Sequence, residues 1–218
     1  MNPVALIIGA GPGIGQAVGA AFAREGCDVA LAARTPSKLE TIRQEISKFG
    51  TRVRSYAVDA GEDAALRAMV EQVRTDLGDP AVLVYNVASQ GMTKPVALTG
   101  DKLVHDFKLN VGGALAAVQA VVEPMKAARK GTILLTGGGF AYEPSANYAS
   151  LSLGKAALRN LTYSLAQELG GYGIHVATVS VYGFIQSGTH FDPNRIAEVF
   201  LKLHRQRPGH FQIEQIYK

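Results

Sequence analysis

Cysteine, tryptophan and long apolar runs are scarce in this 218-residue chain, and each shortage excludes a class of structure. The single cysteine, Cys27, rules out an internal disulfide and any metal cage built from cysteines. The five histidines show neither HxxxH nor HxH spacing, so we predict no metal site. No apolar run approaches the ~20 residues of a membrane-spanning helix, and the apolar N-terminus lacks a basic leader. We therefore expect a soluble, cytoplasmic protein with no membrane partner.

Charge of one sign is not concentrated anywhere in the chain. The formal net charge is +4, from 22 lysines and arginines against 18 acidic residues, and the positive residues are scattered. Because nucleic-acid binding depends on a basic face, we expect no nucleic-acid partner. Hydrophobic residues make up 47% of the sequence, enough for the core of one domain covering residues 1–218.

Short apolar runs alternate with amphipathic stretches, without an internal repeat or a linker. Pro124 should kink or interrupt the longest helix, because proline removes a helical hydrogen bond. This alternation predicts an α/β fold, a doubly wound, Rossmann-type parallel sheet with helices on both faces. The expected strands are 4–8, 28–33, 52–58, 81–85, 132–136 and 175–181, with a short edge strand within 209–218. The expected helices are 15–25, 38–49, 62–77, 100–129, 148–169 and 192–206.

A glycine-rich loop directly follows the first predicted strand. Glycine lets the backbone approach a ligand closely, and the free N–H groups at a helix start attract a phosphate. The alternative interpretation is an ordinary β–α turn that happens to be rich in glycine. We predict a nucleotide site formed by this loop, at Gly9, Gly11, Gly13, Ile14 and Gly15.

Arg34 follows the second predicted strand, at the position that meets the adenosine ribose in dinucleotide-binding folds. An acidic residue there would bind the 2′-hydroxyl of NAD, whereas an arginine favours the 2′-phosphate of NADP. The strand ends in Ala32 and Ala33 without an acid. We therefore expect NADP(H) in preference to NAD(H). The alternative is that Arg34 is a solvated surface residue.

From Gly9 to about Gly183 the chain resembles the short-chain dehydrogenase/reductase family. The glycine pattern GxxxGxG of that family is met by Gly9, Gly13 and Gly15, although Ile8 replaces the threonine that usually precedes it. The resemblance extends to four further positions that it implies lie at the cofactor or in the proton relay. Asp59, followed by Ala60, matches the acidic residue near the adenine. Asn86 and Ala88 match the turn after the fourth strand, and Asn110 matches the asparagine of the central helix.

The resemblance also implies a catalytic tyrosine, a lysine four residues later, and a serine on the fifth strand. A tyrosine and a lysine at this spacing share one helix face, which lowers the phenol pKa. Lys155 matches the lysine, which in the family also binds the nicotinamide ribose. However, Leu151 stands at the tyrosine position and Gly138 at the serine position. The chain is thus identified as a divergent member that keeps Lys155 and Asn110 but lacks the usual proton donor.

Other residues are candidates for the missing proton donor, namely Tyr182 and Tyr148 first, then Thr136, Tyr142 and Ser145, or water. Both leading tyrosines could instead be packing residues, and Asn110 could be structural. Two functions stay open. One is an NADP(H)-dependent oxidoreductase acting on a carbonyl or alcohol substrate. The other is an inactive nucleotide-binding or assembly protein. The apolar tail and the helix pairing common in the family favour a homo-oligomer.

Overall fold

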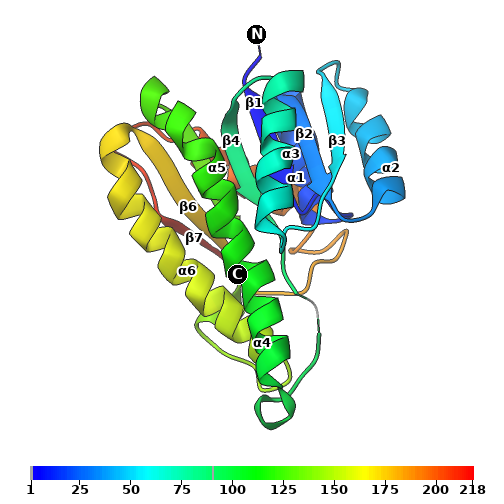
Figure 1. Cartoon of the computed structure of the whole chain (residues 1–218), viewed down its shortest axis with the longest axis vertical. Coiled ribbons are helices and arrows are strands. Elements are labelled where there is room, and N and C mark those ends of the chain that lie inside the picture. The colour runs from blue at the N-terminus through cyan, green and yellow to red at the C-terminus, as the bar shows by residue number, and fades with distance from the viewer. Residues whose placement is uncertain (1, 90) are drawn as a thin grey trace.

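The computed structural model describes residues 2–89 and 91–218, and its centre is a seven-stranded parallel sheet (Figure 1). The strand order is β3-β2-β1-β4-β5-β6-β7, and every neighbouring pair is parallel. This confirms the predicted doubly wound α/β fold. The strands are β1 (Val4–Ile8), β2 (Asp28–Ala33), β3 (Val53–Ala57), β4 (Pro80–Tyr85), β5 (Gly131–Thr136), β6 (Ile174–Val181) and β7 (Glu214–Tyr217).

The helices cover both faces of the sheet. Helices α1, α2 and α7 pack on one face, and α3, α5 and α6 pack on the other. Their bounds are α1 (Ile14–Arg24), α2 (Pro36–Ser47), α3 (Asp63–Asp76), α4 (Gly100–Phe107), α5 (Gly113–Ala128), α6 (Ala149–Leu169) and α7 (Pro193–His204). Outside the 100–129 stretch, strand and helix ends lie within one or two residues of the predicted positions.

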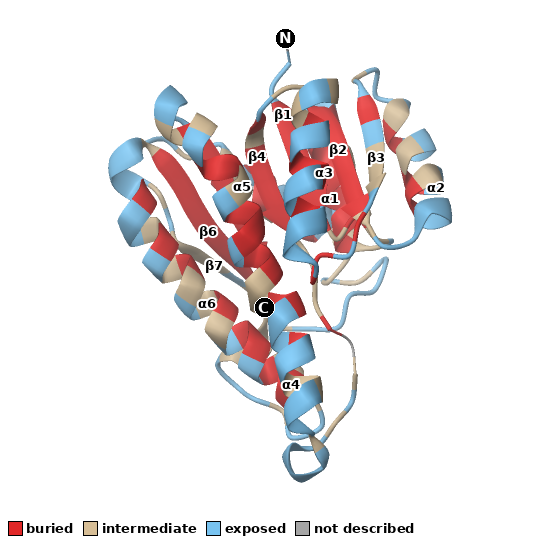
Figure 2. Cartoon of the chain, in the orientation of Figure 1, coloured by how far each residue is buried: buried red, intermediate tan, exposed pale blue. Residues whose placement is uncertain are grey.

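The strands β1, β5 and β6 are buried along their whole length because both of their faces are covered (Figure 2). In β1, the side chains of Val4, Leu6 and Ile8 join the core beneath α3, α5 and α6. The alternate residues, Ala5 and Ile7, join the second core beneath α1, α2 and α7. Alternate side chains of β1 therefore belong to the two hydrophobic cores on opposite faces of the sheet. Packing on both faces holds the carboxyl end of β1, and the loop that follows it, in place.

Of the two effects predicted for Pro124, a kink or an interruption of the long helix, the interruption does not occur. Helix α5 continues through Pro124 to Ala128. Proline at this position frees the carbonyl of Ala120, one turn earlier. The guanidinium of Arg74 on α3 donates to that carbonyl at 2.5 Å, so the missing helical bond is replaced.

The irregularity in this helical stretch lies instead at Lys108–Gly112, a π-helical turn between α4 and α5. Such turns loosen the backbone hydrogen-bond ladder. The buried hydroxyl of Tyr85, at the end of β4, donates to the Leu109 carbonyl at 2.6 Å within this turn. The turn carries Asn110, so β4 determines where that side chain lies.

The predicted edge strand near the C-terminus is confirmed as β7, which pairs with β6. Among residues 2–89 and 91–218, no helix is both long and apolar enough to span a membrane. The same residues contain no cluster of three or more potential metal-binding side chains. The cytoplasmic location stays a prediction.

Candidate active site

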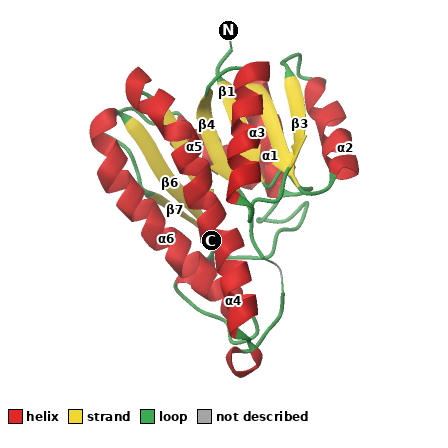
Figure 3. Cartoon of the chain, viewed as in Figure 1, coloured by secondary structure: helices red, strands yellow, loops and turns green. Residues whose placement is uncertain are grey.

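The carboxyl ends of the central strands open into one cleft of about 1400 Å³. Figure 3 shows the connecting loops gathered at this end of the sheet. The cleft lies where the strand order reverses, between β1 and β4, which is the usual ligand position in doubly wound sheets. Eleven of the fourteen predicted site residues line it: Gly9, Gly11, Gly13, Ile14, Arg34, Ala60, Asn86, Ala88, Tyr148, Lys155 and Tyr182.

The glycine loop is held at the end of β1 by contacts that no larger residue permits. A Cβ at Gly9 would lie 2.6 Å from the Asn86 carbonyl oxygen, and one at Gly15 would lie 2.2 Å from the Gly9 oxygen. Gly13 has a φ of 103° and caps α1 without a side chain. The Gln16 N–H donates to the Gly11 carbonyl at 3.0 Å, which leaves the N–H groups of Ile14 and Gly15 for a ligand. The loop and helix start therefore fit a phosphate, and Gly15 acts by packing although it does not line the cleft.

Asn86 fixes the glycine loop to the neighbouring strands. Its side-chain Nδ2 donates to the Gly9 carbonyl at 3.0 Å, and its Oδ1 accepts from the Thr136 hydroxyl at 2.8 Å. Its backbone N–H donates to Ile8 at 2.7 Å. These bonds join β1, β4 and β5 at the cleft floor. The Thr136 hydroxyl is thereby engaged, which weakens its candidacy as the proton donor.

Arg34 and Lys38 lie together at the β2 end of the cleft. Both side chains are exposed. Lys38 lies in the first turn of α2, a turn without any acidic residue, and Thr35 does not cap the helix with its side chain. A cation at a helix start is unfavourable unless an anion is present. The sequence analysis missed Lys38, although its position one turn after Arg34 could have indicated it.

Lys155 projects from α6 into the wall of the cleft. Its Nζ donates to the Thr136 carbonyl at 2.5 Å, and the residue is 9% exposed. Burial lowers the pKa of Lys155 to about 8, because desolvation penalises the ammonium. Leu151, one turn earlier on α6, and Gly138, just after β5, line the same cleft. Neither of these residues has a group that transfers a proton.

Asn110 and Asp59 are the other predicted site residues that do not line the cleft. The Asn110 side chain is buried and binds Ser89 twice: Oδ1 accepts from the backbone N–H at 2.7 Å, and Nδ2 donates to the hydroxyl at 3.0 Å. A Cβ at Gly154 would lie 2.5 Å from Nδ2, so α6 encloses it. The Asp59 carboxylate accepts from the Gly61 N–H at 2.9 Å. The two Asn110 bonds therefore position Ser89, which lines the cleft.

The two candidate tyrosines line the cleft but are held by aromatic packing. The Tyr148 ring stacks on Phe140 with centroids 5.4 Å apart. The Tyr182 ring lies against Gly139, where a Cβ would approach within 2.8 Å, and 5.8 Å from the Tyr142 ring. Burial raises the pKa of Tyr182, and the nearby carboxylates of Glu143 and Glu214 raise it further. Tyr182 is thus a poorer acid than a free phenol.

The outer part of the cleft contains residues that the sequence analysis did not single out. Lys102 and Asp106 on α4 form an ion pair of 2.9 Å within its lining. Their i, i+4 spacing indicated a helical pair but not which way α4 faces. The rim is apolar, with Met92, Phe184 and Ile185 at 69%, 78% and 41% exposure.

Comparisons with known proteins agree with this geometry. The family model for short chain dehydrogenases matches residues 3–192. A very-long-chain 3-oxoacyl-CoA reductase from Aspergillus terreus is 35% identical over 184 residues, covering 82% of this chain and 52% of the relative. Cyclohexanol dehydrogenase from a Rhodococcus species is 29% identical over 203 residues, covering 85% and 75%. The chain spans about half the length of the 3-oxoacyl-CoA reductases it matches.

Solved structures show the same fold. A metagenomic short-chain oxidoreductase in complex with NADP has a TM-score of 0.90 and 27% identity, covering 98% of this chain and 96% of that one. L-Sorbose reductase from Gluconobacter frateurii, complexed with NADPH and L-sorbose, has a TM-score of 0.90 and 25% identity, covering 99% and 94%. A glycine loop at the switch point of a doubly wound sheet is the arrangement of dinucleotide-binding proteins. This chain belongs to the short chain dehydrogenase family.

Proposed function

We propose that the protein is an NADP(H)-dependent oxidoreductase that interconverts a carbonyl and an alcohol without the usual tyrosine. The observation that carries this proposal is the cradle at the end of β1, where Gly9 and Gly15 pack too closely for any side chain. Such a cradle with an uncapped helix start has room for a pyrophosphate. The NADP and NADPH held by two similar structures support the same conclusion.

We propose that Arg34 and Lys38 set the preference for NADP(H) by binding its 2′-phosphate. Both are exposed cations without an acidic partner in the adjacent turn, at the end of the cleft next to Ala33. Charge-assisted bonds of this kind are roughly twice as strong as neutral ones. Lys155 would hold the ribose hydroxyls at the opposite end, next to Thr136. The cofactor supplies hydride chemistry, and these residues supply its position.

The substrate we propose is a carbonyl compound with an apolar flank. Met92, Leu151, Phe184 and Ile185 surround the outer part of the cleft. Binding sites for such compounds combine apolar walls with a few polar groups that fix orientation. The names of two relatives, a 3-oxoacyl-CoA reductase and a cyclohexanol dehydrogenase, favour substrates of this kind.

A second candidate function is nucleotide binding without turnover, as in a sensor or assembly subunit. The observation in its favour is that Gly138 and Leu151 leave the two positions of the usual serine and tyrosine without a hydroxyl. Removing a general acid typically reduces the rate by about 10²–10⁴. Weak turnover is therefore compatible with the first function, and its complete absence would support the second.

Fluorescence titration with NADPH and NADH, followed by a screen of apolar aldehydes and ketones, tests both functions. We expect tighter binding of NADPH and substrate-dependent oxidation of the bound cofactor. Tight binding without oxidation of any carbonyl would favour the binding protein. If neither dinucleotide binds, both functions are wrong.

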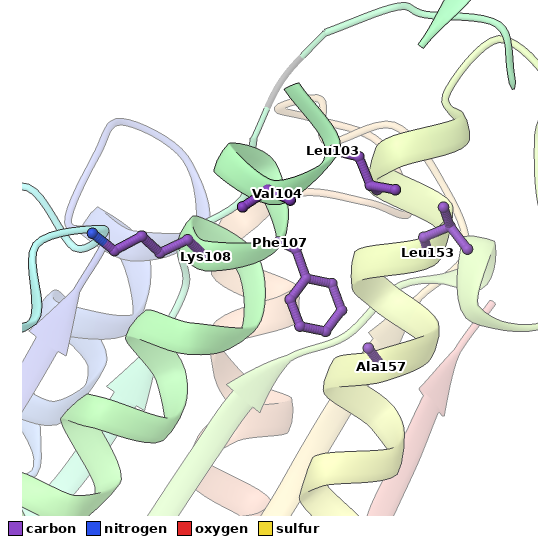
Figure 4. Close-up of a pocket in the computed structure, with 6 residues that line it drawn as sticks. All are labelled: Leu103, Val104, Phe107, Lys108, Leu153 and Ala157. Atoms are coloured by element: carbon purple, nitrogen blue, oxygen red, sulfur yellow. The ribbon is translucent and has the colours of Figure 1, made fainter. Parts of the chain in front are cut away.

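We also propose that the protein is a homo-oligomer that associates through the outer face of α4 and α6. A groove of about 570 Å³ lies between these helices, lined by Leu103, Val104, Phe107, Lys108, Leu153 and Ala157 (Figure 4). Val104 and Leu153 are 69% and 51% exposed. Figure 4 shows the Phe107 ring pointing between the helices and Lys108 pointing away. Paired helices pack well against the same face of a second copy.

Light scattering on the purified protein tests this association. We expect at least a dimer for the wild type and a smaller particle for Leu153→Glu, which places a charge in the apolar groove. Leu115→Glu, at a 38% exposed position on α5 outside the groove, is the matched control. A monomeric wild type would contradict the proposal.

A further inference from the structure

Lys155 is an ammonium group without a counter-ion. Its one hydrogen bond among the described residues goes to the backbone carbonyl of Thr136, and no carboxylate forms an ion pair with it. A carbonyl oxygen replaces only part of the hydration that a buried cation loses. Burial therefore lowers the pKa of this amine to about 8, so the ammonium form loses its proton far more readily than an exposed lysine does.

The other charged and titratable groups around the cleft do not shift the pKa of Lys155. They come from α4, from the loops after β5 and β6, and from the end of β2, and burial is the sole cause of the shift at Lys155. No phenol is coupled to Lys155 in the way that the family pattern implies. These surrounding groups are Lys102, His105, Asp106, Glu143, Tyr148, Tyr182, Arg34 and Lys38.

Gly138 leaves room beside the lysine stem. A Cβ built at Gly138 would lie 3.7 Å from Cγ, Cδ and Cε of Lys155, an ordinary contact distance, and its φ of −176° suits any residue. A serine side chain would therefore fit there without strain. Because the glycine has none, a substrate oxygen can occupy this space next to Lys155. Leu151 closes the same side of the cleft without offering a competing hydroxyl.

We propose that Lys155 is itself the proton donor of the reaction, a role that rests on the proposed function. In reduction, the carbonyl carbon takes up a hydride from the reduced nicotinamide. The π electron pair of the C=O bond moves to oxygen, which forms its O–H bond with a proton from Nζ. Lys155 is left as a neutral amine and regains a proton from water. In oxidation, the neutral amine accepts the alcohol proton while the carbinol carbon gives its hydride to the oxidised nicotinamide. An apolar pocket suits this chemistry, because a lysine with a pKa near the working pH is an efficient acid and base.

The protonation state of the Lys155 side chain can be measured in the free protein by an NMR pH titration. Protein labelled with ¹³C at lysine Cε gives a resonance that Lys155→Arg removes and so assigns. Lys130→Arg, at an exposed position just before β5 and outside the cleft, is the matched control. We expect the resonance assigned to Lys155 to titrate near pH 8, well below the ordinary lysine value of about 10.4. A Lys155 that titrates with the other lysines would overturn the proposal.

The pH dependence of carbonyl reduction tests the role of this proton. The acid form is needed, so kcat/KM of the wild type should fall as pH rises above about 8. Lys155→Arg, which keeps the charge but cannot release a proton, should lower kcat by about 10²–10⁴. The fall of kcat/KM above about pH 8, the basic limb of the profile, should be absent in this variant. NADPH binding to the variant should weaken by less than about tenfold, which separates proton transfer from ribose binding. A limb that persists in Lys155→Arg would overturn the proposal.

The tyrosine variants distinguish this role from a substitute phenol. The midpoint of the fall in kcat/KM should stay near pH 8 in both Tyr182→Phe and Tyr148→Phe. If it disappears in either one, that tyrosine is the donor and Lys155 is not. If the wild type binds NADPH but reduces no carbonyl, the proposed oxidoreductase function fails and the donor role with it. If turnover occurs without dependence on Lys155, only the donor role fails.

Discussion

At the glycine loop after β1, the wall of the cleft is formed by closely packed backbone, whereas at the β5–α6 end it depends on single side chains. The glycine loop is fixed by contacts of 2.2 and 2.6 Å that would meet any added Cβ. Around Lys155, by contrast, Gly138 has ordinary room for a larger residue, and Leu151 is only partly buried. The first end resists substitution because the backbone itself would have to move. The second end can lose its hydroxyls while the fold persists.

The largest effect should come from restoring hydroxyls at the β5–α6 end. The double substitution Gly138→Ser with Leu151→Tyr should raise carbonyl reduction by about 10²-fold, the lower end of what a positioned acid contributes, because the wild type already has the proton donor proposed at Lys155. The serine fits, because its Cβ would make 3.7 Å contacts with the Lys155 stem. Steady-state rates with NADPH measure the gain.

Each single substitution should give a smaller gain than the pair, because tyrosine and serine act on one oxygen. Gln167→Tyr, an exposed change on the same helix outside both the cleft and the α4–α6 groove, is the matched control. If the double variant binds NADPH but its rate is unchanged, the β5–α6 end cannot regain its activity through these two side chains alone.

The next largest effect should come from disturbing the backbone end. Gly15→Ala places a Cβ 2.2 Å from the Gly9 carbonyl oxygen, so the loop must shift. We expect NADPH affinity to fall by at least about tenfold, with a loss of about 1–3 kcal/mol in the free energy of unfolding. Fluorescence titration and urea denaturation measure the two effects. Gly100→Ala, whose Cβ would meet nothing within 4 Å, should change neither.

A smaller effect is expected at the phosphate contact. Arg34→Asp should weaken NADPH binding by roughly 10–100-fold, corresponding to the ~1.5–3 kcal/mol of a charged hydrogen bond. NADH affinity should hold or rise, because the new carboxylate can accept from a ribose hydroxyl. Competition titrations give the ratio of the NADPH affinity to the NADH affinity. Arg54→Asp reverses charge on β3 outside the cleft and should leave it unchanged. Equal ratios for wild type and Arg34→Asp would refute the role of Arg34.

The smallest effect on the cleft should come from an ion pair at the opposite end of the sheet. Burial would raise the pKa of Asp28, but hydrogen bonds from the Arg52 backbone and guanidinium and from Asn2 hold it below its ordinary value. This lowered pKa stabilises the fold fully above the unfolded value of about 3.9. The stabilisation is lost as pH falls through the folded pKa.

Arg52→Met should therefore reduce the free energy of unfolding by about 1–3 kcal/mol near neutral pH. The deficit relative to wild type should shrink below about pH 4, as Asp28 becomes protonated in both proteins. Urea denaturation across pH measures it, with Arg54→Met as control, while NADPH affinity should stay the same. A loss of NADPH binding would show that the backbone end depends on this remote pair.

The fold and the backbone end of the site were predictable from local patterns. Apolar strands such as Val4–Ile8 and the spacing of Gly9, Gly13 and Gly15 fix secondary structure and a phosphate cradle through sterics alone. What local patterns missed depends on long-range contacts. The survival of the helix at Pro124 requires Arg74 from α3, and the π-helical turn at Asn110 receives a bond from Tyr85.

The β5–α6 end was predictable in its residues but not in their surroundings. Lys155, Leu151 and Gly138 were identified through the family resemblance, whereas the absence of a counter-ion beside Lys155 among the described residues emerges only from the packing of α6 on β5. The roles of Tyr148 and Tyr182 stay predictions. Their stacking on Phe140 and against Gly139 had no local signal in the sequence.

The central claim is that an intact cofactor cradle supports carbonyl reduction without the usual tyrosine. Its most direct test mixes NADPH-loaded wild-type protein with apolar ketones and aldehydes near neutral pH and follows the NADPH absorbance, with Gly15→Ala as the background. We expect a substrate-dependent loss of NADPH absorbance in the wild type that exceeds the background. Bound NADPH that persists with every carbonyl tested would contradict it.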